Sequence, residues 1–140
     1  QASYEKDIAD FLTEYMESVA DPEKPTRFDY IAEEQTFKTT FRVLSQALGE
    51  AAFSGVNKQG NPMGYFSALH FEALTIGIQP HLDKLAGADD CQKEKFKNAL
   101  QELKRDAGFQ TLTKGGGKNY AAALKKRIEF VEQRVAECLK

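Results

Sequence analysis

Apolar residues recur along the chain at intervals of three and four, which is the spacing of helices with one buried face. The first run covers about residues 4–20 and ends where Pro22 and Pro25 prevent a helix from continuing. Its apolar stripe consists of Ile8, Phe11, Leu12, Tyr15 and Val19. A second run covers about residues 29–53 and leads into residues 55–64, where glycine, asparagine and proline are typical of a surface loop. We therefore expect two amphipathic helices followed by a loop.

A third run, over about residues 66–84, is apolar around most of its circumference. This pattern predicts a central helix that packs against neighbours on several sides. Ser67 is in the right place to cap the start of this helix. Gly77 and Pro80 weaken its far end, because a proline removes one helical hydrogen bond and clashes with the preceding turn. We expect the central helix to kink or end early at Pro80.

Two further helical runs complete the chain. One begins at Asp89 or Asp90 and has apolar residues at Phe96, Leu100, Leu103 and Ala107. The other follows Asn119, which we expect to cap it, and its stripe consists of Tyr120, Leu124, Ile128, Val131, Val135 and Leu139. Residues 109–112, between the two, are too few to form a sheet. The sequence thus predicts an all-α fold, a single-domain bundle of about five helices over residues 1–140.

The composition is that of a globular chain. Of its 140 residues, 41% are hydrophobic and 29% are charged, which argues against disorder. No apolar run approaches the length of about 18 residues that spans a membrane, and no basic-then-apolar leader is present. We therefore expect a cytoplasmic protein without a membrane partner. Because the chain opens on Gln1 rather than methionine, we also expect a C-terminal fragment of a longer protein.

Charge is unevenly distributed along the chain. Residues 1–36 hold ten acidic and three basic side chains, a net charge of −7, whereas residues 107–128 hold five basic side chains and no acidic one. A chain with this polarity is suited to bind an acidic partner through its C-terminal part. Alternatively, the two ends face each other, or each faces solvent.

The stretch TKGGGKN, residues 113–119, raises the question of phosphate binding, because glycines and lysines before a helix attract anions. It is not a Walker phosphate loop, because Asn119 stands where a serine or threonine would hold magnesium. Two interpretations remain open: a loose anion site, or a flexible joint that ends in an asparagine cap. For the first, the candidate phosphate or DNA contacts are Lys114, Lys118, Lys125 and Lys126. So few contacts would make DNA binding weak and independent of sequence.

Catalytic and metal-binding patterns are absent from the sequence. His70 and His81 would lie about 16 Å apart along a helix, too far to share one metal ion. Cys91 and Cys138 lack metal-ligand spacing, and we expect both to be reduced. No Glu-x-x-His pair and no nucleophile motif is present. We therefore expect no enzymatic activity, no cofactor and no metal in these 140 residues.

Four segments, taken in order, resemble one protein family. DIADFLTEYMESV near the start is similar to that family's LxxFLNEFM segment, and FKTTFRVLSQALGEAAF to its phenylalanine-rich helix. YFSALHFEALTIGI and KKRIEFVEQRVAECL resemble its two later helices. The family is the GmrSD-like restriction and defence family, whose members carry a ParB/sulfiredoxin-fold nucleotidase domain. The chain resembles the C-terminal helical region of that family.

The resemblance implies that the parent is a bacterial, nucleotide-dependent DNA restriction or anti-phage defence protein. The nucleotidase half carries an Asp-Gly-Gln-Gln-Arg-type motif, which this chain lacks, so no catalytic residue is carried over. The chain would then be a non-catalytic interaction and support module. Its partner would be the N-terminal nucleotidase domain of the same parent chain or another subunit. The alternative is a free-standing helical regulatory or binding protein unrelated to DNA defence.

Two of the positions that match the family pattern are polar, namely Glu72, which lies in a mostly apolar helix, and Arg127. The other matching positions, such as Phe37, Phe41, Phe53 and Phe71, are interpreted as fold determinants. A carboxylate surrounded by apolar residues needs a partner. We therefore predict that Glu72 and Arg127 form a buried structural polar pair.

Overall fold

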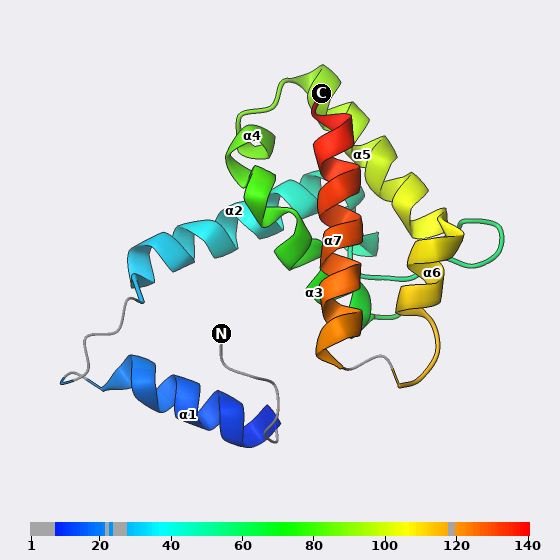
Figure 1. Cartoon of the computed structure of the whole chain (residues 1–140). Coiled ribbons are helices and arrows are strands. Elements are labelled where there is room, and N and C mark those ends of the chain that lie inside the picture. The colour runs from blue at the N-terminus through cyan, green and yellow to red at the C-terminus, as the bar shows by residue number, and fades with distance from the viewer. Residues whose placement is uncertain (1–7, 22, 24–27, 118–119) are drawn as a thin grey trace. The chain divides into compact units, whose positions relative to one another are not determined.

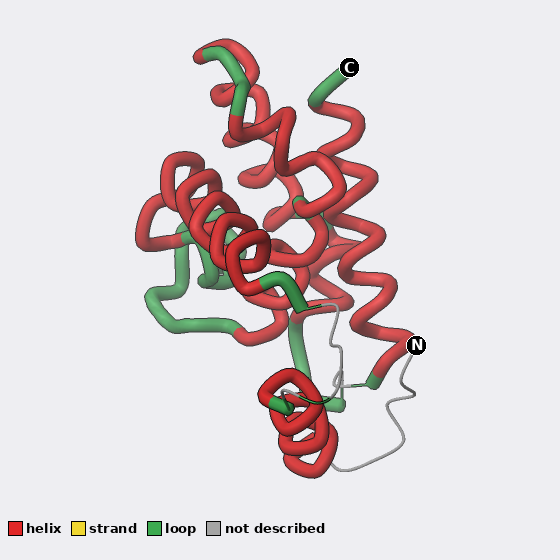
Figure 2. The backbone as a smooth tube through the Cα atoms, turned by 90° about the vertical axis from the view of Figure 1, so that its left-hand side faces the viewer, coloured by secondary structure: helices red, strands yellow, loops and turns green. Residues whose placement is uncertain are grey.

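The computed structural model describes residues 8–21, 23, 28–117 and 120–140. The regular structure in these residues is helical apart from one isolated bridge between Val56 and Pro62, which confirms the all-α prediction (Figure 2). The α-helices are α1 (Ile8–Ala20), α2 (Tyr30–Leu48), α3 (Ala68–Gly77), α4 (Leu82–Ala86), α5 (Asp90–Arg105), α6 (Ala107–Thr113) and α7 (Ala121–Cys138). Short 3-10 turns, Gly49–Ala51 and Gln79–His81, follow α2 and α3. In this part of the chain six helices have seven or more residues, so the predicted count of about five is one too low.

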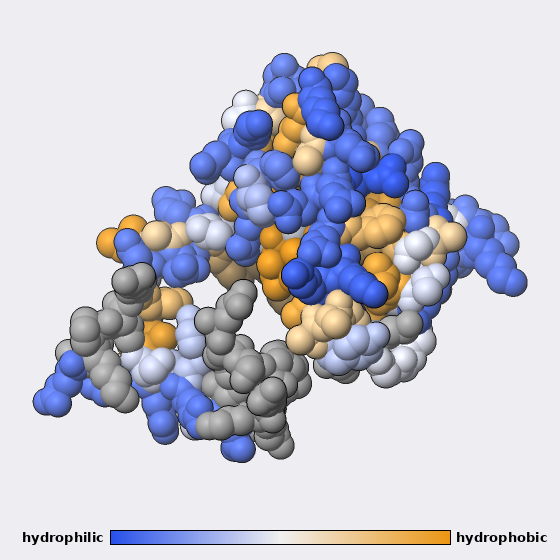
Figure 3. All heavy atoms as spheres, viewed as in Figure 1, coloured by the Kyte–Doolittle hydropathy of each residue, from blue (hydrophilic) through white to orange (hydrophobic). Residues whose placement is uncertain are grey.

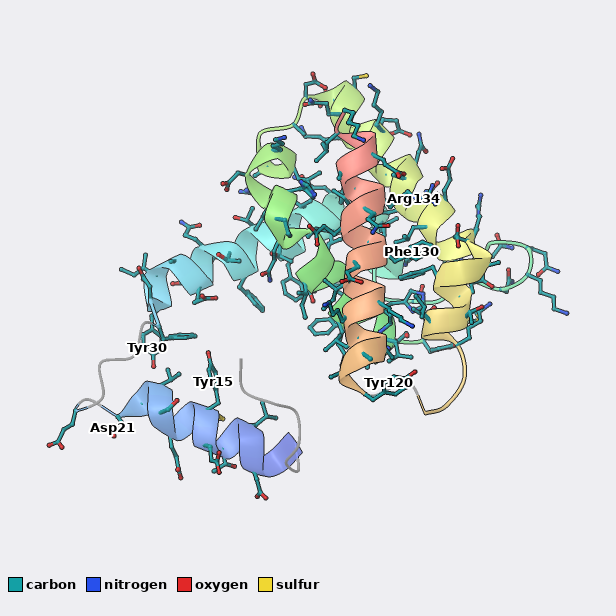
Figure 4. All side chains as sticks on the ribbon, in the orientation of Figure 1. Tyr15, Asp21, Tyr30, Tyr120, Phe130 and Arg134 are labelled. Carbon is teal, nitrogen blue, oxygen red and sulfur yellow. The ribbon has the colours of Figure 1, made fainter. Side chains whose placement is uncertain are left out.

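The chain divides into two compact units, Gln1–Gln35 and Thr36–Lys140, with the boundary inside α2. In the first unit, the ring of Phe28 stands edge-on to the rings of Tyr15 and Tyr30, at centroid distances of 6.5 and 4.8 Å (Figure 4). The second unit contains α3 to α7 and the hydrophobic core. The prediction of one domain over residues 1–140 stays a prediction.

Helix α7 is the central element of the second unit and packs along α3, α5 and α6 (Figure 1). Its Val131 and Val135 are fully buried, together with Leu44, Leu74, Ile78, Leu100, Leu103 and Phe109. Gly77 lets α3 approach α7 closely, because a Cβ atom at this position would lie 2.7 Å from the Cβ of Val131. The glycine in this apolar helix therefore serves packing rather than flexibility.

The central helix predicted over residues 66–84 is interrupted. Helix α3 ends at Gly77, and Pro80 lies in the 3-10 turn that separates it from α4. Proline cannot donate a backbone hydrogen bond, so the predicted early end is confirmed and the single helix to residue 84 is wrong. The N-terminal prediction is also confirmed, because the Oγ of Ser67 accepts from the backbone N–H of His70 at 3.4 Å. Asp89 caps α5 in a reciprocal arrangement with Gln92.

Helix α6 covers the residues that the sequence analysis left without a helix. The Asp106 carboxylate caps it by accepting from the backbone N–H groups of Gly108, at 2.7 Å, and Phe109, at 3.2 Å. The ring of Phe109 lies 5.8 Å from that of Phe130 on α7, and Arg134 donates to Asp106 at 3.5 Å (Figure 4). These contacts hold α6 against α7.

The start of α7 differs from the prediction. Tyr120 occupies the capping position of this helix and makes no side-chain cap bond. The predicted cap, Asn119, lies outside the described residues.

Candidate functional site

Two of the four lysines proposed to contact phosphate, Lys114 and Lys125, have a side-chain partner within the described part of the protein. The ammonium of Lys114, just after α6, donates to the side-chain oxygen of Gln110 at 2.8 Å. In the second turn of α7, Lys125 pairs with Glu129 at 3.8 Å, and Lys126 is exposed. Lys118 lies outside the described residues. Of the described lysines in this set, only Lys125 meets a carboxylate, because the Gln110 amide that Lys114 contacts is neutral.

The structure brings Glu72 and Arg127 together. The guanidinium of Arg127 on α7 donates to the carboxylate of Glu72 on α3 at 2.9 Å. The arginine side chain is 1% exposed and the glutamate 40% exposed, so the arginine alone is buried. The bond therefore joins α3 and α7 at the margin of the core.

Lys104 is a buried cation that the sequence analysis did not identify. The residue is 4% exposed, and its ammonium donates to three backbone carbonyls: Ala51 at 2.6 Å, Ala52 at 2.7 Å and Ser54 at 2.9 Å. Carbonyl groups after a helix carry partial negative charge and need donors, which explains the site. Burial lowers the pKa of Lys104 from 10.5 to about 8. The lysine therefore ties the segment after α2 to α5.

His70 lies close to this cation. Its Nδ1 atom is 2.9 Å from the hydroxyl of Ser67, and its ring stands edge-on to Phe109 at 5.4 Å. Burial, followed by the positive charges of Lys104 and Lys114, lowers the pKa of His70 from 6.5 to about 4. The imidazole is therefore neutral at neutral pH, so it adds no further buried positive charge beside Lys104.

A hollow of about 500 Å³ opens between α2, the loop after it and α5. Three cationic side chains line it, Lys97, Lys104 and Arg105, and its lining contains no carboxylate. We call it the cationic hollow. Its remaining polar lining is formed by the side-chain amides of Gln46, Asn61 and Gln101.

Five phenylalanine rings from α2, the following loop and α3 pack on one another. Neighbouring ring centroids are 4.4 to 6.2 Å apart in the set Phe37, Phe41, Phe53, Phe66 and Phe71. We call this set the aromatic face. Phe37 is 62% exposed and Phe66 65% exposed, while the other three rings are half-buried. A hollow of about 390 Å³ beside it is lined by Phe53, Tyr65 and Phe66.

Apolar side chains also interrupt the hydrophilic surface of the second unit on the side seen in Figure 3.

Among the described residues, no three histidine, cysteine or acidic side chains are grouped so that they would hold a metal ion. Both cysteines are free, and burial raises the pKa of the Cys138 thiol. No helix in the described ranges has the length and apolarity needed to cross a membrane.

No family model, curated protein or solved structure matches the chain. The fold and the sites therefore define the protein only as an all-α protein with an exposed aromatic face and a separate cationic hollow. The resemblance to the GmrSD-like family stays a prediction.

Proposed function

We propose that the chain is a non-catalytic helical interaction module and that the aromatic face is its docking surface. The observation that carries this proposal is the exposure of Phe37 and Phe66, both above 60%, on a continuous set of packed rings. Large exposed apolar patches on a protein mark sites of interaction, and aromatic side chains are enriched at the centres of interfaces.

The packing of the aromatic face favours tight docking. The two exposed rings rest against Phe41, Phe53 and Phe71, so little side-chain entropy remains to be lost when a partner binds. The adjacent hollow, beside Tyr65, offers a partly enclosed place for one apolar side chain of the partner. A fully desolvated anchor in such a hollow contributes much of the affinity of an interface.

For the partner we propose the nucleotidase domain of the same parent chain, or another subunit of a bacterial DNA restriction or anti-phage protein. The segments that resemble the GmrSD-like family support this choice. A free-standing helical regulatory or binding protein is the alternative. The source gene discriminates between them: an in-frame upstream segment with an Asp-Gly-Gln-Gln-Arg-like motif supports the defence module, and a start codon near Gln1 supports the alternative.

The docking proposal is tested by producing the upstream domain as a separate chain and measuring its binding to this chain by calorimetry. We expect Phe66→Ser and Phe37→Ser each to weaken binding by about tenfold or more. Ile76→Ser is the matched control, because Ile76 is also exposed but lies five residues beyond Phe71, on a different face of α3. Equal effects of all three changes, or no complex with the wild type, would overturn the proposal. The chain alone is expected to hydrolyse neither ATP nor GTP.

A further inference from the structure

We propose that the cationic hollow binds a small organic phosphate monoester, held between Lys97, Lys104 and Arg105. This site is independent of the aromatic face, and the inference does not rest on the proposed docking function. It rests on the charge of the lining, on unused hydrogen-bond donors and on the loop that positions Arg105.

The charge of the hollow matches a dianion. Lys97 shares its charge with Glu94 at 3.5 Å. Lys104 and Arg105 have no carboxylate within ion-pair distance among the described residues, and both line the hollow. At neutral pH these two side chains contribute about two positive charges that no described carboxylate neutralises, since a lysine with a pKa of about 8 is still mostly protonated. A phosphate monoester, with a charge of about −2, neutralises them, whereas a monocarboxylate leaves one unmatched.

The two cations have different parts in the site. All three N–H groups of the Lys104 ammonium are taken up by backbone carbonyls, so this lysine supplies positive charge rather than a hydrogen bond. The guanidinium of Arg105 makes no hydrogen bond within the described chain, and its fork of donors suits phosphate oxygens. The side-chain amides of Gln46, Asn61 and Gln101 likewise make none there.

A glycine loop places Arg105 at the hollow. Gly60 has φ +84°, and a Cβ atom there would lie 2.5 Å from the Nε of Arg105. The loop is held by Asn57, whose side-chain oxygen accepts from the backbone N–H groups of Gln59 and Asn61 at 3.0 and 2.9 Å. The guanidinium of Arg105 therefore lies against the backbone of this loop at Gly60.

The size of the hollow indicates an ester rather than inorganic phosphate. Its volume of about 500 Å³ falls within the range of small-molecule sites, roughly 300–1,000 Å³. Leu48, Val56 and Pro62 provide apolar lining beside the cations. The phosphate would contact the cationic side, and the organic group would contact these three residues.

The test is a titration of the full chain with phenyl phosphate, followed by ¹H–¹⁵N NMR at constant ionic strength. We expect the largest shifts at the side-chain amides of Asn61 and Gln101 and at the Nε–H of Arg105. Benzoate and inorganic phosphate are the comparison ligands, and both should bind more weakly. Bound phenyl phosphate should also raise the pKa of Lys104, because a nearby dianion stabilises the ammonium.

Three variants make the test specific. Arg105→Gln should weaken phenyl phosphate binding by about tenfold, because it removes a charged hydrogen-bond donor from the hollow. The residue is exposed, so the change should not disturb the core. Lys97→Gln should have a smaller effect, since Glu94 already offsets its charge. Lys95→Gln, an exposed lysine of α5 outside the lining, is the matched control and should bind as the wild type does. Equal weakening by Lys95→Gln, equal affinity for benzoate, or no localised shifts at millimolar ligand would overturn the proposal.

Discussion

Arg127 and Glu72 join α7 to α3 by a hydrogen bond of 2.9 Å between residues that are 55 positions apart in the chain. The buried guanidinium meets a carboxylate that is open to solvent on one side. The bond is therefore stronger than a surface ion pair but is partly screened by water.

From this geometry we predict that Glu72→Gln lowers the free energy of unfolding by about 1 kcal/mol. Arg127→Ala should cost roughly 3 kcal/mol, because it also leaves a cavity in the core. Urea denaturation measures both values. Glu129→Gln is the matched control on the same helix, since it breaks an exposed pair with Lys125 and should change stability by less than about 0.5 kcal/mol. A Glu72→Gln variant as stable as Glu129→Gln would contradict the prediction.

Gly77→Ala is predicted to destabilise the protein by about 1–3 kcal/mol, although alanine favours helices more than glycine does. The added methyl group would come within 2.7 Å of Val131. Thermal unfolding measures the effect, and Gly116→Ala, where nothing lies within 4 Å, is the control. The closest atoms include the Cβ of Val131 and, at 3.1 Å, the backbone oxygen of Ile128, so trimming Val131 to alanine would not remove the conflict. A Gly77→Ala variant as stable as the wild type would contradict the prediction.

Stability should rise with pH in the alkaline range because of Lys104. Its pKa is about 8 in the folded protein and 10.5 in the unfolded chain, so the unfolded chain binds more protons between these values. Lys104→Met should cost about 2 kcal/mol at pH 7, because three carbonyls lose their donor. The difference in free energy of unfolding between the wild type and Lys104→Met should increase by roughly 2 kcal/mol from pH 8 to pH 10. Urea denaturation across this range measures it, and a constant difference would count against the assignment.

His70 makes the protein sensitive to acid. Its pKa is about 4 in the folded protein and 6.5 in the unfolded chain. Its contribution to the free energy of unfolding is therefore fully present above pH 6.5 and is lost as the pH falls from 6.5 to about 4. The loss attributable to this residue is roughly 3 kcal/mol. A His70→Gln variant should lose correspondingly less stability between pH 7 and pH 4, as measured by denaturation at each pH. Parallel pH profiles of the two proteins would exclude this role.

The proposed phosphate contacts predict weak DNA binding, micromolar or weaker in low salt and independent of sequence. Changing Lys114, Lys118 and Lys125 together to glutamate should abolish it in a fluorescence-anisotropy titration. The matched control changes Lys84, Lys93 and Lys95 to glutamate, which alters net charge equally. Absence of binding, or equal loss in both triple variants, would leave the glycines as a joint. The positive φ angles of Gly115 and Gly117 suit such a joint.

The sequence pattern predicted the helices whose apolar stripes are long, because the period of the stripe reflects burial along one face. Helix α6 was not predicted because its seven residues are too few to show a helical repeat of apolar positions. Asp106, just before it, is a residue type that commonly caps a helix. Lys104 falls four residues after Leu100, on the buried side of α5. A lysine at such a position is ordinarily taken to lie at the edge of the apolar stripe, with its charge in solvent. The three acceptors of Lys104 lie some fifty residues earlier in the chain, and no local pattern connects them.

The pair of Glu72 and Arg127 was predicted because both are polar positions in the segments that resemble the GmrSD-like family, and because a carboxylate in a mostly apolar helix needs a partner. The aromatic face and the cationic hollow were not predictable in the same way. Each is assembled from α2, a loop and one further helix, so its members come together only through the tertiary arrangement of those elements. Sequence spacing reports which face of a helix is buried, and it does not report which other element covers that face.

The bonds of the Lys104 ammonium also determine which segments of the structure unfold together. Its bonds to Ala51, Ala52 and Ser54 close a ring of about fifty residues without a covalent link. We therefore expect the segment after α2 and the last turn of α5 to separate in one subglobal opening, and the protected amides of both to show the same free energy of opening in hydrogen exchange. After a protease cut in the exposed tip at Lys58 and Gln59, the bonds of Lys104 would still join the two fragments, together with the core contacts of α2 and the bond from the Ser67 N–H to the Phe53 carbonyl at 2.8 Å.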